Sequence, residues 1–317
     1  MKDIIIGMAV GDALGVPFEF IARSDMKMKP CKGMVGYGAH GQPVGTWSDD
    51  TSMALCIIDS LCNGLNYTDM ANKFYSWLYQ SLWTPYGEVF DNGISTKIAI
   101  NRWKTGKYIP SECGGITEDS NGNGSVMRTL VLVPFLEDKN IYKRYEVISK
   151  VSSITHAHWI SKFSCLLVCE YALALRKGLD KDDAFTAAVE SLVIIKEFEK
   201  EYGDDVTDEN YQKVFGNLIS KIENDSVENE DFRGSGYARD TALTSIWCIM
   251  TTDSYKNSTI KAVNYGEDTD TTACVTGGLA GVLYGIGGIP TDWVDCIARK
   301  GDILELVEKY QSVYEVV

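Results

Sequence analysis

The sequence predicts an all-α fold, and three observations support this prediction. Apolar residues recur at the period of an amphipathic helix over most of the 317 residues. Runs of β-branched residues with strict two-residue alternation, the pattern of a half-buried strand, are scarce. No repeat, low-complexity tract or linker interrupts the chain, so we expect residues 1–317 to form a single domain.

The predicted helices follow from this periodicity. Residues 1–10 are a short apolar run between Asp3 and Asp12 without the basic segment that opens a signal peptide, so we expect a core helix. Residues 49–62 carry apolar side chains on one helical face, and Gly64 is a stop signal. Similar patterns predict helices over residues 163–176, 182–197 and 241–251.

The stretch 197–232 differs from the rest because it is dense in Asp, Glu, Lys and Asn. Its apolar residues nevertheless keep helical spacing and predict an exposed amphipathic helix between loops. The residues on that apolar face are Tyr211, Val214, Phe215, Leu218, Ile219 and Ile222.

A glycine stripe marks one further helix. Gly277, Gly281 and Gly285 recur every fourth position on the face that Ala273 begins. Glycine inside a helix costs about 1 kcal/mol per residue, so the stripe needs a physical reason. We favour close packing against a neighbouring helix, and a broken, loop-like segment is the alternative. The run 273–290 is too short and too rich in glycine to span a bilayer.

The composition disfavours several classes of function. With a formal net charge of −14, the chain would not neutralise nucleic-acid phosphates in bulk, so we expect no general nucleic-acid binding. Nine cysteines are scattered without a CxxC pair, which predicts reduced thiols in a cytoplasmic protein without membrane association. There are only three histidines, so we expect no zinc site.

Two acidic clusters at opposite ends of the chain carry the strongest functional signal. The first, GTWSDDT, contains Ser48, Asp49 and Asp50, and the second, GEDTDTT, contains Asp268 and Asp270. Each places carboxylates beside hydroxyl groups, the hard oxygen ligands that Mg²⁺ and Mn²⁺ prefer. Each is also a favourable helix start. Four carboxylates brought together by folding would repel one another without cations between them, so we expect a two-metal hydrolytic site.

Two further acids are weaker candidates. Glu19 follows Pro17, which forces an extended exit from the preceding helix, and an ordinary surface glutamate is the alternative. Asp91 lies in the turn-like sequence FDNG. Either carboxyl could reach a site built from the two clusters.

Other motifs could bind a substrate. Residues 121–128, NGNGSVMR, precede an apolar run, where free backbone N–H groups could cradle a phosphate, and a plain turn is the alternative. His156 and His158 could bond to a phosphate or ribose, although packed structural histidines are equally expected. Tyr237 follows Gly236 and could stack on a base or ribose.

In their order along the chain, these motifs resemble the ADP-ribosylglycohydrolase family. The segments concerned are GDALGVPFEF, GTWSDDTSMAL, FDNG, NGNGSVMR, THAH, SGYARDT and GEDTDTTACVTGGLAG. The resemblance covers about residues 5–290 and is closer to the bacterial dinitrogenase reductase-activating glycohydrolase branch. It implies a compact orthogonal bundle of helices with a central cleft that holds two Mg²⁺ or Mn²⁺ ions.

The resemblance also implies roles for residues at matching positions. Glu19 matches a mobile acid near the metals, and Asp91 matches an acid that faces the scissile bond. With these two, Asp49 and Asp270 are the expected catalytic residues. The implied metal ligands are Ser48, which stands where the family usually has threonine, and Asp49, Asp50, Asp268, Asp270 and Thr271. The implied substrate contacts are Gly122, Asn123, Gly124, Ser125, Met127, His156 and Tyr237.

The implied reaction is hydrolytic removal of ADP-ribose from a modified side chain, and ADP-ribosyl-arginine on a protein is the favoured substrate. ADP-ribosyl-serine and O-acetyl-ADP-ribose are alternatives, and the −14 charge disfavours a modified nucleic acid. A non-catalytic relative that only binds ADP-ribose is a further alternative. Such a protein would be expected to lose the metal-binding aspartates, and all four are present here.

Overall fold

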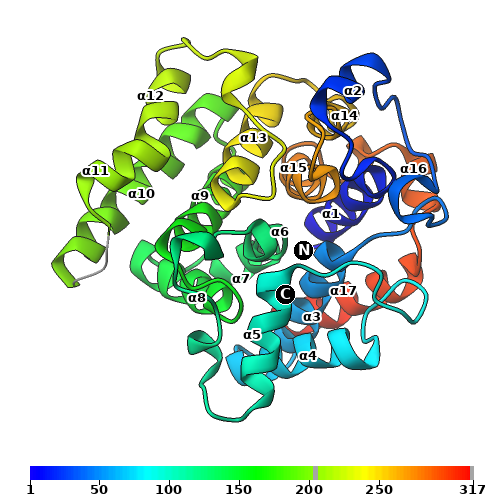
Figure 1. Ribbon diagram of the computed structural model, residues 1–317, viewed down its shortest axis with the longest axis horizontal. Coiled ribbons are helices and arrows are strands. Elements are labelled where there is room, and N and C mark those ends of the chain that lie inside the picture. Colours follow the sequence, from blue (N-terminus) through cyan, green and yellow to red (C-terminus); the bar gives the residue numbers. More distant parts are fainter. Residues whose placement is uncertain (203–205, 315–317) are drawn as a thin grey trace.

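The computed structural model describes residues 1–202 and 206–314, and it confirms the all-α prediction (Figure 1). Over these residues, β pairing is limited to isolated bridges. The longer helices are α1 (Lys2–Gly15), α3 (Asp49–Leu61), α4 (Tyr67–Gln80), α5 (Ile94–Lys104), α8 (Ile141–Ser153), α9 (Trp159–Arg176), α10 (Lys181–Tyr202), α13 (Ala238–Met250), α14 (Tyr255–Val263), α15 (Thr269–Tyr284) and α17 (Lys300–Tyr314). The shorter ones are α2 (Arg23–Met28), α6 (Val126–Thr129), α7 (Val133–Leu136), α11 (Asp208–Tyr211), α12 (Asn217–Glu223) and α16 (Thr291–Asp295).

Helices α1 and α15 pack directly against each other near the centre of the molecule (Figure 1). A Cβ atom added to Gly7 would lie 2.3 Å from the carbonyl oxygen of Gly277, and one added to Gly11 would lie 2.0 Å from that of Ala273. Because the contact order is reversed along the two helices, they run antiparallel. The close-packing interpretation of the C-terminal stripe is confirmed, and its partner is a second glycine stripe on α1.

The last glycine of the C-terminal stripe has a different role from the others. Gly285 lies just beyond α15 with φ of 66°, so it ends the helix in a backbone conformation that favours glycine. The chain then continues into a short 3₁₀ turn, η9 (Ile286–Gly288).

The acidic stretch 197–232 forms part of an arm at one edge of the molecule (Figure 1). Helices α11 and α12 are joined without a break by a π-helical turn, η7 (Gln212–Gly216), and residues 203–205 lie outside the described part. One face of this helical run is buried against the body of the protein rather than exposed. Its buried side chains are Tyr211, Phe215, Leu218, Ile219 and Ile222.

The other predicted helices are also present, with shifted ends. The N-terminal helix extends to Gly15 because small residues continue its contact with α15. Helix α9 begins at Trp159, where the His158 side chain accepts the backbone N–H of Ile160 at 3.4 Å. His158 therefore caps a helix. All nine cysteines are free thiols, as expected, and all but Cys296 are buried.

Candidate active site

Three helix ends meet at one point and bring the acidic clusters together. The antiparallel packing of α1 on α15 places the last turn of α1 beside the first turn of α15, where a Cβ on Gly15 would lie 2.3 Å from the Cα of Asp270. Helix α3 begins at Asp49, with Ser48 as its N-cap. The aspartates of both clusters thus lie at helix N-termini, whose partial positive charge stabilises carboxylates.

The core of the site is a cluster of three carboxyl groups from Asp12, Asp50 and Asp270. One oxygen from each lies within 4.8 Å of the others, and all three residues are buried. The hydroxyls of Ser48 and Thr271 both donate to Asp50 Oδ2, at 3.0 and 3.3 Å. The structure therefore joins residues from both acidic clusters, as the sequence predicted, around a third acid from α1. We call Asp12, Asp50 and Asp270 the inner cluster.

Asp12 is a member of this cluster that the sequence analysis did not assign to the site. Its carboxylate accepts the backbone N–H of Ser48 at 2.9 Å and that of Thr51 at 3.1 Å, and the Thr51 hydroxyl at 2.6 Å. It therefore caps the first turn of α3 from a different helix and fixes where that helix begins. The available signal was a charged residue inside an otherwise apolar and glycine-rich helix.

The hydrogen-bonding pattern leaves carboxylate oxygens without partners. Among the described residues, Asp50 Oδ1, Asp268 Oδ1 and Asp270 Oδ2 are buried and accept no hydrogen bond. The other oxygen of Asp268 is fixed, because it accepts the side-chain amide of Asn123 at 2.9 Å. Buried, unpartnered carboxylate oxygens are costly unless a cation neutralises them, so this donor set fits a hard divalent metal ion.

The electrostatics of the site agree with this interpretation. Burial, together with the neighbouring carboxylates, raises the pKa of Asp49, Asp50 and Asp270 well above the usual range. Burial also raises the pKa of Asp12, to about 6, although four hydrogen bonds oppose the shift. Without a cation, protonation is the remaining way to relieve the repulsion.

We expect the metal-free protein to lose stability as the pH rises. Burial raises the pKa of Asp12 to about 6, and burial with nearby Asp91 raises that of Glu19 to about 9. The protons bound to these carboxyls stabilise the folded protein fully below about pH 4, where the carboxyls of the unfolded chain are also protonated. This stabilisation is lost as the pH rises through the pKa values of the folded state. Thermal unfolding in EDTA, from about pH 5 to about 9, should show a fall of several degrees.

Saturating Mg²⁺ should flatten this trend, because a bound cation replaces the protons as the neutralising charge. A melting temperature in EDTA that stays constant or increases over the same pH range would contradict a repulsive, cation-binding cluster.

A second group of titratable side chains lies further out, formed by Glu19, His40 and Asp91. One ligand atom from each lies within 4.8 Å of the others. Glu19 follows the 3₁₀ turn η1 (Val16–Phe18) and contacts His40 directly. We call these three residues the outer cluster. Both acids are predicted site residues from the sequence, whereas His40 is not.

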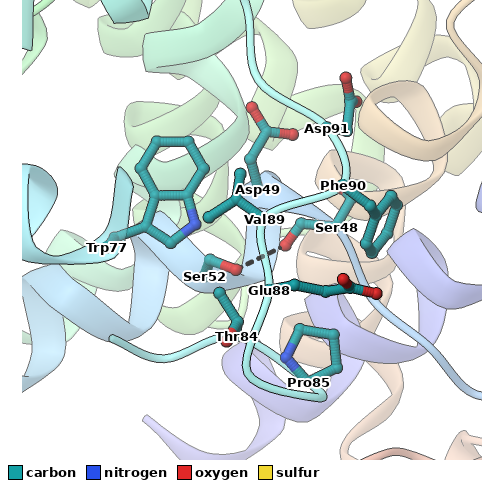
Figure 2. Close-up of a pocket in the computed structure, with 10 residues that line it drawn as sticks. All are labelled: Ser48, Asp49, Ser52, Trp77, Thr84, Pro85, Glu88, Val89, Phe90 and Asp91. Carbon is teal, nitrogen blue, oxygen red and sulfur yellow. Dashed lines mark hydrogen bonds between the residues drawn. The ribbon is translucent and has the colours of Figure 1, made fainter. Parts of the chain in front are cut away.

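The outer cluster is linked to the start of α3 through a small pocket (Figure 2). Residues 84–91 cross the start of α3 at this pocket, and Asp49 and Asp91 both line it. Figure 2 shows the carboxyl groups of these two residues pointing in the same direction. The hydroxyl of Ser52 donates to the Ser48 carbonyl at 2.8 Å and fixes the pocket floor. Burial raises the pKa of Asp91, although His40 opposes the shift.

The loop 121–128 reaches the site through one side chain. Asn123 donates to Asp268 and to the Thr241 hydroxyl, both at 2.9 Å, and its backbone N–H donates to the Gly236 carbonyl at 3.0 Å. This loop is thereby joined to the segment that carries Tyr237, which forms an isolated bridge with Gly122. Tyr237 is half-buried and lines a cavity of about 450 Å³.

Of the remaining predicted substrate contacts, Ser125 and Met127 belong to this loop and His156 lies beneath it. The side chains of Ser125 and Met127 are buried, and the Ser125 hydroxyl accepts a hydrogen bond from Ser152 at 3.0 Å. The ring of His156 packs under Gly124, where a Cβ would lie 2.8 Å from Cε1. Burial, helped by Arg128, lowers the pKa of His156 to about 3, so this ring is neutral and supports the loop.

Comparison with known proteins identifies the family. The sequence profile of the ADP-ribosylglycohydrolases matches residues 1–317. This chain belongs to the ADP-ribosylglycohydrolase family. As expected from the motifs, it is an enzyme of the glycohydrolase type. An ADP-ribosylarginine hydrolase, Tri1 of Pseudomonas putida, is 29% identical over 97% of this chain and 76% of its own length.

Two further relatives extend the comparison. An ADP-ribosyl-dinitrogen reductase glycohydrolase of Rhodospirillum rubrum is 25% identical over 93% of this chain and 89% of its own length. A solved structure described as an ADP-ribosylglycohydrolase-related protein complex superimposes with a TM-score of 0.76 at 25% identity, over 97% of this chain and 95% of that one. No helix among residues 1–202 and 206–314 is long and apolar enough to cross a membrane.

Proposed function

We propose that this glycohydrolase is a metal-dependent hydrolase that releases ADP-ribose from modified arginine side chains of proteins, with two Mg²⁺ or Mn²⁺ ions. The single observation that carries the proposal is the set of buried carboxylate oxygens without hydrogen-bond partners on Asp50, Asp268 and Asp270. A stable fold does not leave such groups uncompensated without reason. The hydroxyls beside them add neutral oxygen ligands without adding repulsion.

The ions would be held by residues at the starts of α3 and α15, which are Ser48, Asp49, Asp50, Asp268, Asp270 and Thr271. When bound, divalent ions at this point can orient ribose hydroxyls and lower the pKa of a water molecule. Asp12 holds the first turn of α3 in place, and Asn123 fixes one oxygen of Asp268. These two residues therefore orient the ligand set from outside it.

The outer acids are the candidates for proton transfer. Cleavage of a glycosidic bond at ribose passes through an oxocarbenium-like transition state and needs one group to activate water and another to assist the leaving group. Glu19 and Asp91 belong to the same outer cluster, and Asp91 shares a pocket with Asp49. Both carboxyls are thus close to the proposed metal ligands without being among them.

The charge of the site favours arginine as the leaving group. The small pocket beside Asp49 is lined by the additional acids Glu88 and Asp91, and no lysine or arginine of the described part of the chain lines it. A guanidinium group is attracted to such a surface, whereas a neutral serine hydroxyl gains little from it. The similarity to an ADP-ribosylarginine hydrolase supports the same choice. The nucleoside end of the substrate would lie toward the 121–128 loop and Tyr237, above His156.

We expect the purified protein to release free ADP-ribose from an ADP-ribosyl-arginine peptide in the presence of Mg²⁺ or Mn²⁺. Release from a matched ADP-ribosyl-serine peptide should be at least about tenfold slower, because the serine linkage lacks the guanidinium. Chromatographic measurement of ADP-ribose, with each ion and with EDTA, tests the metal and the linkage together. Equal rates with EDTA would refute metal dependence, and faster release from serine would refute the choice of linkage.

A further inference from the structure

We infer that His40 is a positioning residue that holds the outer acid Glu19 in a fixed arrangement beside Asp91 and the inner cluster. The inference rests on the proposed function, because it assigns His40 a part in the same hydrolytic site. His40 itself need not touch the substrate.

The contacts of His40 point in this direction. Its Nε2 atom contacts Glu19 Oε2, and the side chains of His40 and Glu19 are only 12% and 8% exposed. Asp91 completes the group, with one oxygen within 4.8 Å of the other two ligand atoms. The imidazole ring therefore lies close to both carboxyl groups, which would otherwise repel each other.

Two aromatic rings contact the imidazole. The ring centroid of His40 lies 5.7 Å from that of Phe20 and 5.2 Å from that of Phe90. Phe20 is the residue after Glu19, and Phe90 is the residue before Asp91. Glu19 is thus linked to His40 through its carboxyl group and through the neighbouring ring of Phe20, whereas Asp91 is linked to His40 through the ring of Phe90.

The backbone places His40 beside two segments that are distant in the sequence. His40 ends the 3₁₀ turn η2 (Gly38–His40), which is pressed against the Glu19 segment so closely that a Cβ on Gly38 would lie 2.0 Å from the Pro17 carbonyl oxygen. Asp91 lies on a separate loop between α4 and α5. His40 is therefore placed to connect two segments that are about 70 residues apart in the sequence.

The energetic consequence concerns catalysis more than folding. A misplacement of about 1 Å in a group that takes part in a reaction can cost about 100-fold in rate. Loss of His40 removes the contact that fixes Glu19 and leaves the two acids free to move apart. The proposed substrate contacts, in the loop 121–128 and at Tyr237, lie on other segments, so we expect substrate binding to change little.

The decisive experiment is a double-mutant cycle with the Mg²⁺-loaded protein on ADP-ribosyl-arginine peptide. We expect His40→Ala to lower kcat about 30- to 100-fold with KM changed less than about threefold. His40→Gln, which can still donate a hydrogen bond, should recover much of the loss. In a Glu19→Gln background, His40→Ala should cost less than about threefold, because it acts through Glu19. Gln42→Ala, in the same loop, should leave kcat unchanged.

Additive effects of His40→Ala and Glu19→Gln, or a His40→Ala variant that is as active as the parent, would overturn the inference. Equal losses in His40→Ala and His40→Gln, with a parallel loss of Mg²⁺ affinity by calorimetry, would also overturn it and make His40 a metal ligand. A parent protein that releases no ADP-ribose from either linkage would refute the proposed function instead.

The contact between His40 and the outer acids can also be tested by NMR, without a measurement of activity. The chain has only three histidines, so the Cε1–H resonance of His40 can be assigned as the signal that His40→Gln removes. We expect both Glu19→Gln and Asp91→Asn to shift this resonance in the Mg²⁺-bound protein, and Gln42→Ala to leave it in place. A resonance that responds to neither acid would overturn the inference whatever the substrate.

Discussion

Replacement of Asp270 by alanine should lower kcat by about a thousandfold or more, since charge stabilisation by a metal ion supplies several kcal/mol at the transition state. Asp270 is 1% exposed, it belongs to the inner cluster, and its Oδ2 atom has no hydrogen-bond partner among the described residues. Its other oxygen only accepts the backbone N–H of Thr271, at 2.9 Å. The free oxygen is therefore available for an ion, and its loss should also weaken Mg²⁺ binding measured by calorimetry.

The same variant should show an opposite effect on folding. In EDTA and at neutral pH, the Asp270→Ala protein should melt at a higher temperature than the parent, because one of the repelling carboxyls is gone. With Mg²⁺, the parent should gain stability and the variant should gain little. Asp183→Ala is the matched control, because Asp183 is an exposed acid in the first turn of α10. Full activity of Asp270→Ala, or of the parent in EDTA, would exclude the two-metal proposal.

Replacement of Gly11 by alanine should destabilise the protein by about 3 kcal/mol or more, at the upper end of the overpacking range. The added Cβ would lie 2.0 Å from the Ala273 carbonyl oxygen and 2.7 Å from its carbon. Both are backbone atoms of α15, so no side chain can rotate away, and the two helices must separate. Urea unfolding of the parent and the variant measures the difference.

Separation of these helices should also damage the site, because Asp12 follows Gly11 on α1 and Asp270 lies at the adjoining end of α15. Gly301→Ala provides the matched control: Gly301 lies in the first turn of α17, and a Cβ there would meet nothing within 4 Å. That change should stabilise the protein by up to about 1 kcal/mol. If Gly11→Ala were as stable as Gly301→Ala, close packing of α1 on α15 would be refuted.

Much of the fold was predictable because it depends on local patterns. Apolar side chains at helical spacing predicted α3, α9, α10 and α13, and the structure changes only their ends. The glycine stripe at Gly277 and Gly281 predicted close packing without naming the partner helix. The stretch 197–232 was harder to predict. It was expected to form an exposed helix, but its apolar face is buried along a run that includes a π-helical turn at Gln212–Gly216.

Local patterns were less informative about the site. The two acidic clusters were visible because each combines several acids and hydroxyls within a few residues. Asp12 and His40 are single polar residues without such a setting, and the signal for Asp12, a charge inside an apolar, glycine-rich helix, does not by itself indicate a site. Their importance arises from contacts with residues on other elements, such as Thr51 for Asp12 and Glu19 for His40.

The sequence by itself determined the helical class, the family and the acids of the two clusters, because these depend on residue type and on spacing within short segments. Only the tertiary structure decided which acids share one site. Glycines without side chains let α1 and α15 approach antiparallel, and this packing sets the end of one helix beside the start of the other. The carboxyl groups of Asp12 and Asp270, far apart in the sequence, are thereby forced together in a buried space. Their repulsion there, which no single segment encodes, is the physical reason to expect a bound cation.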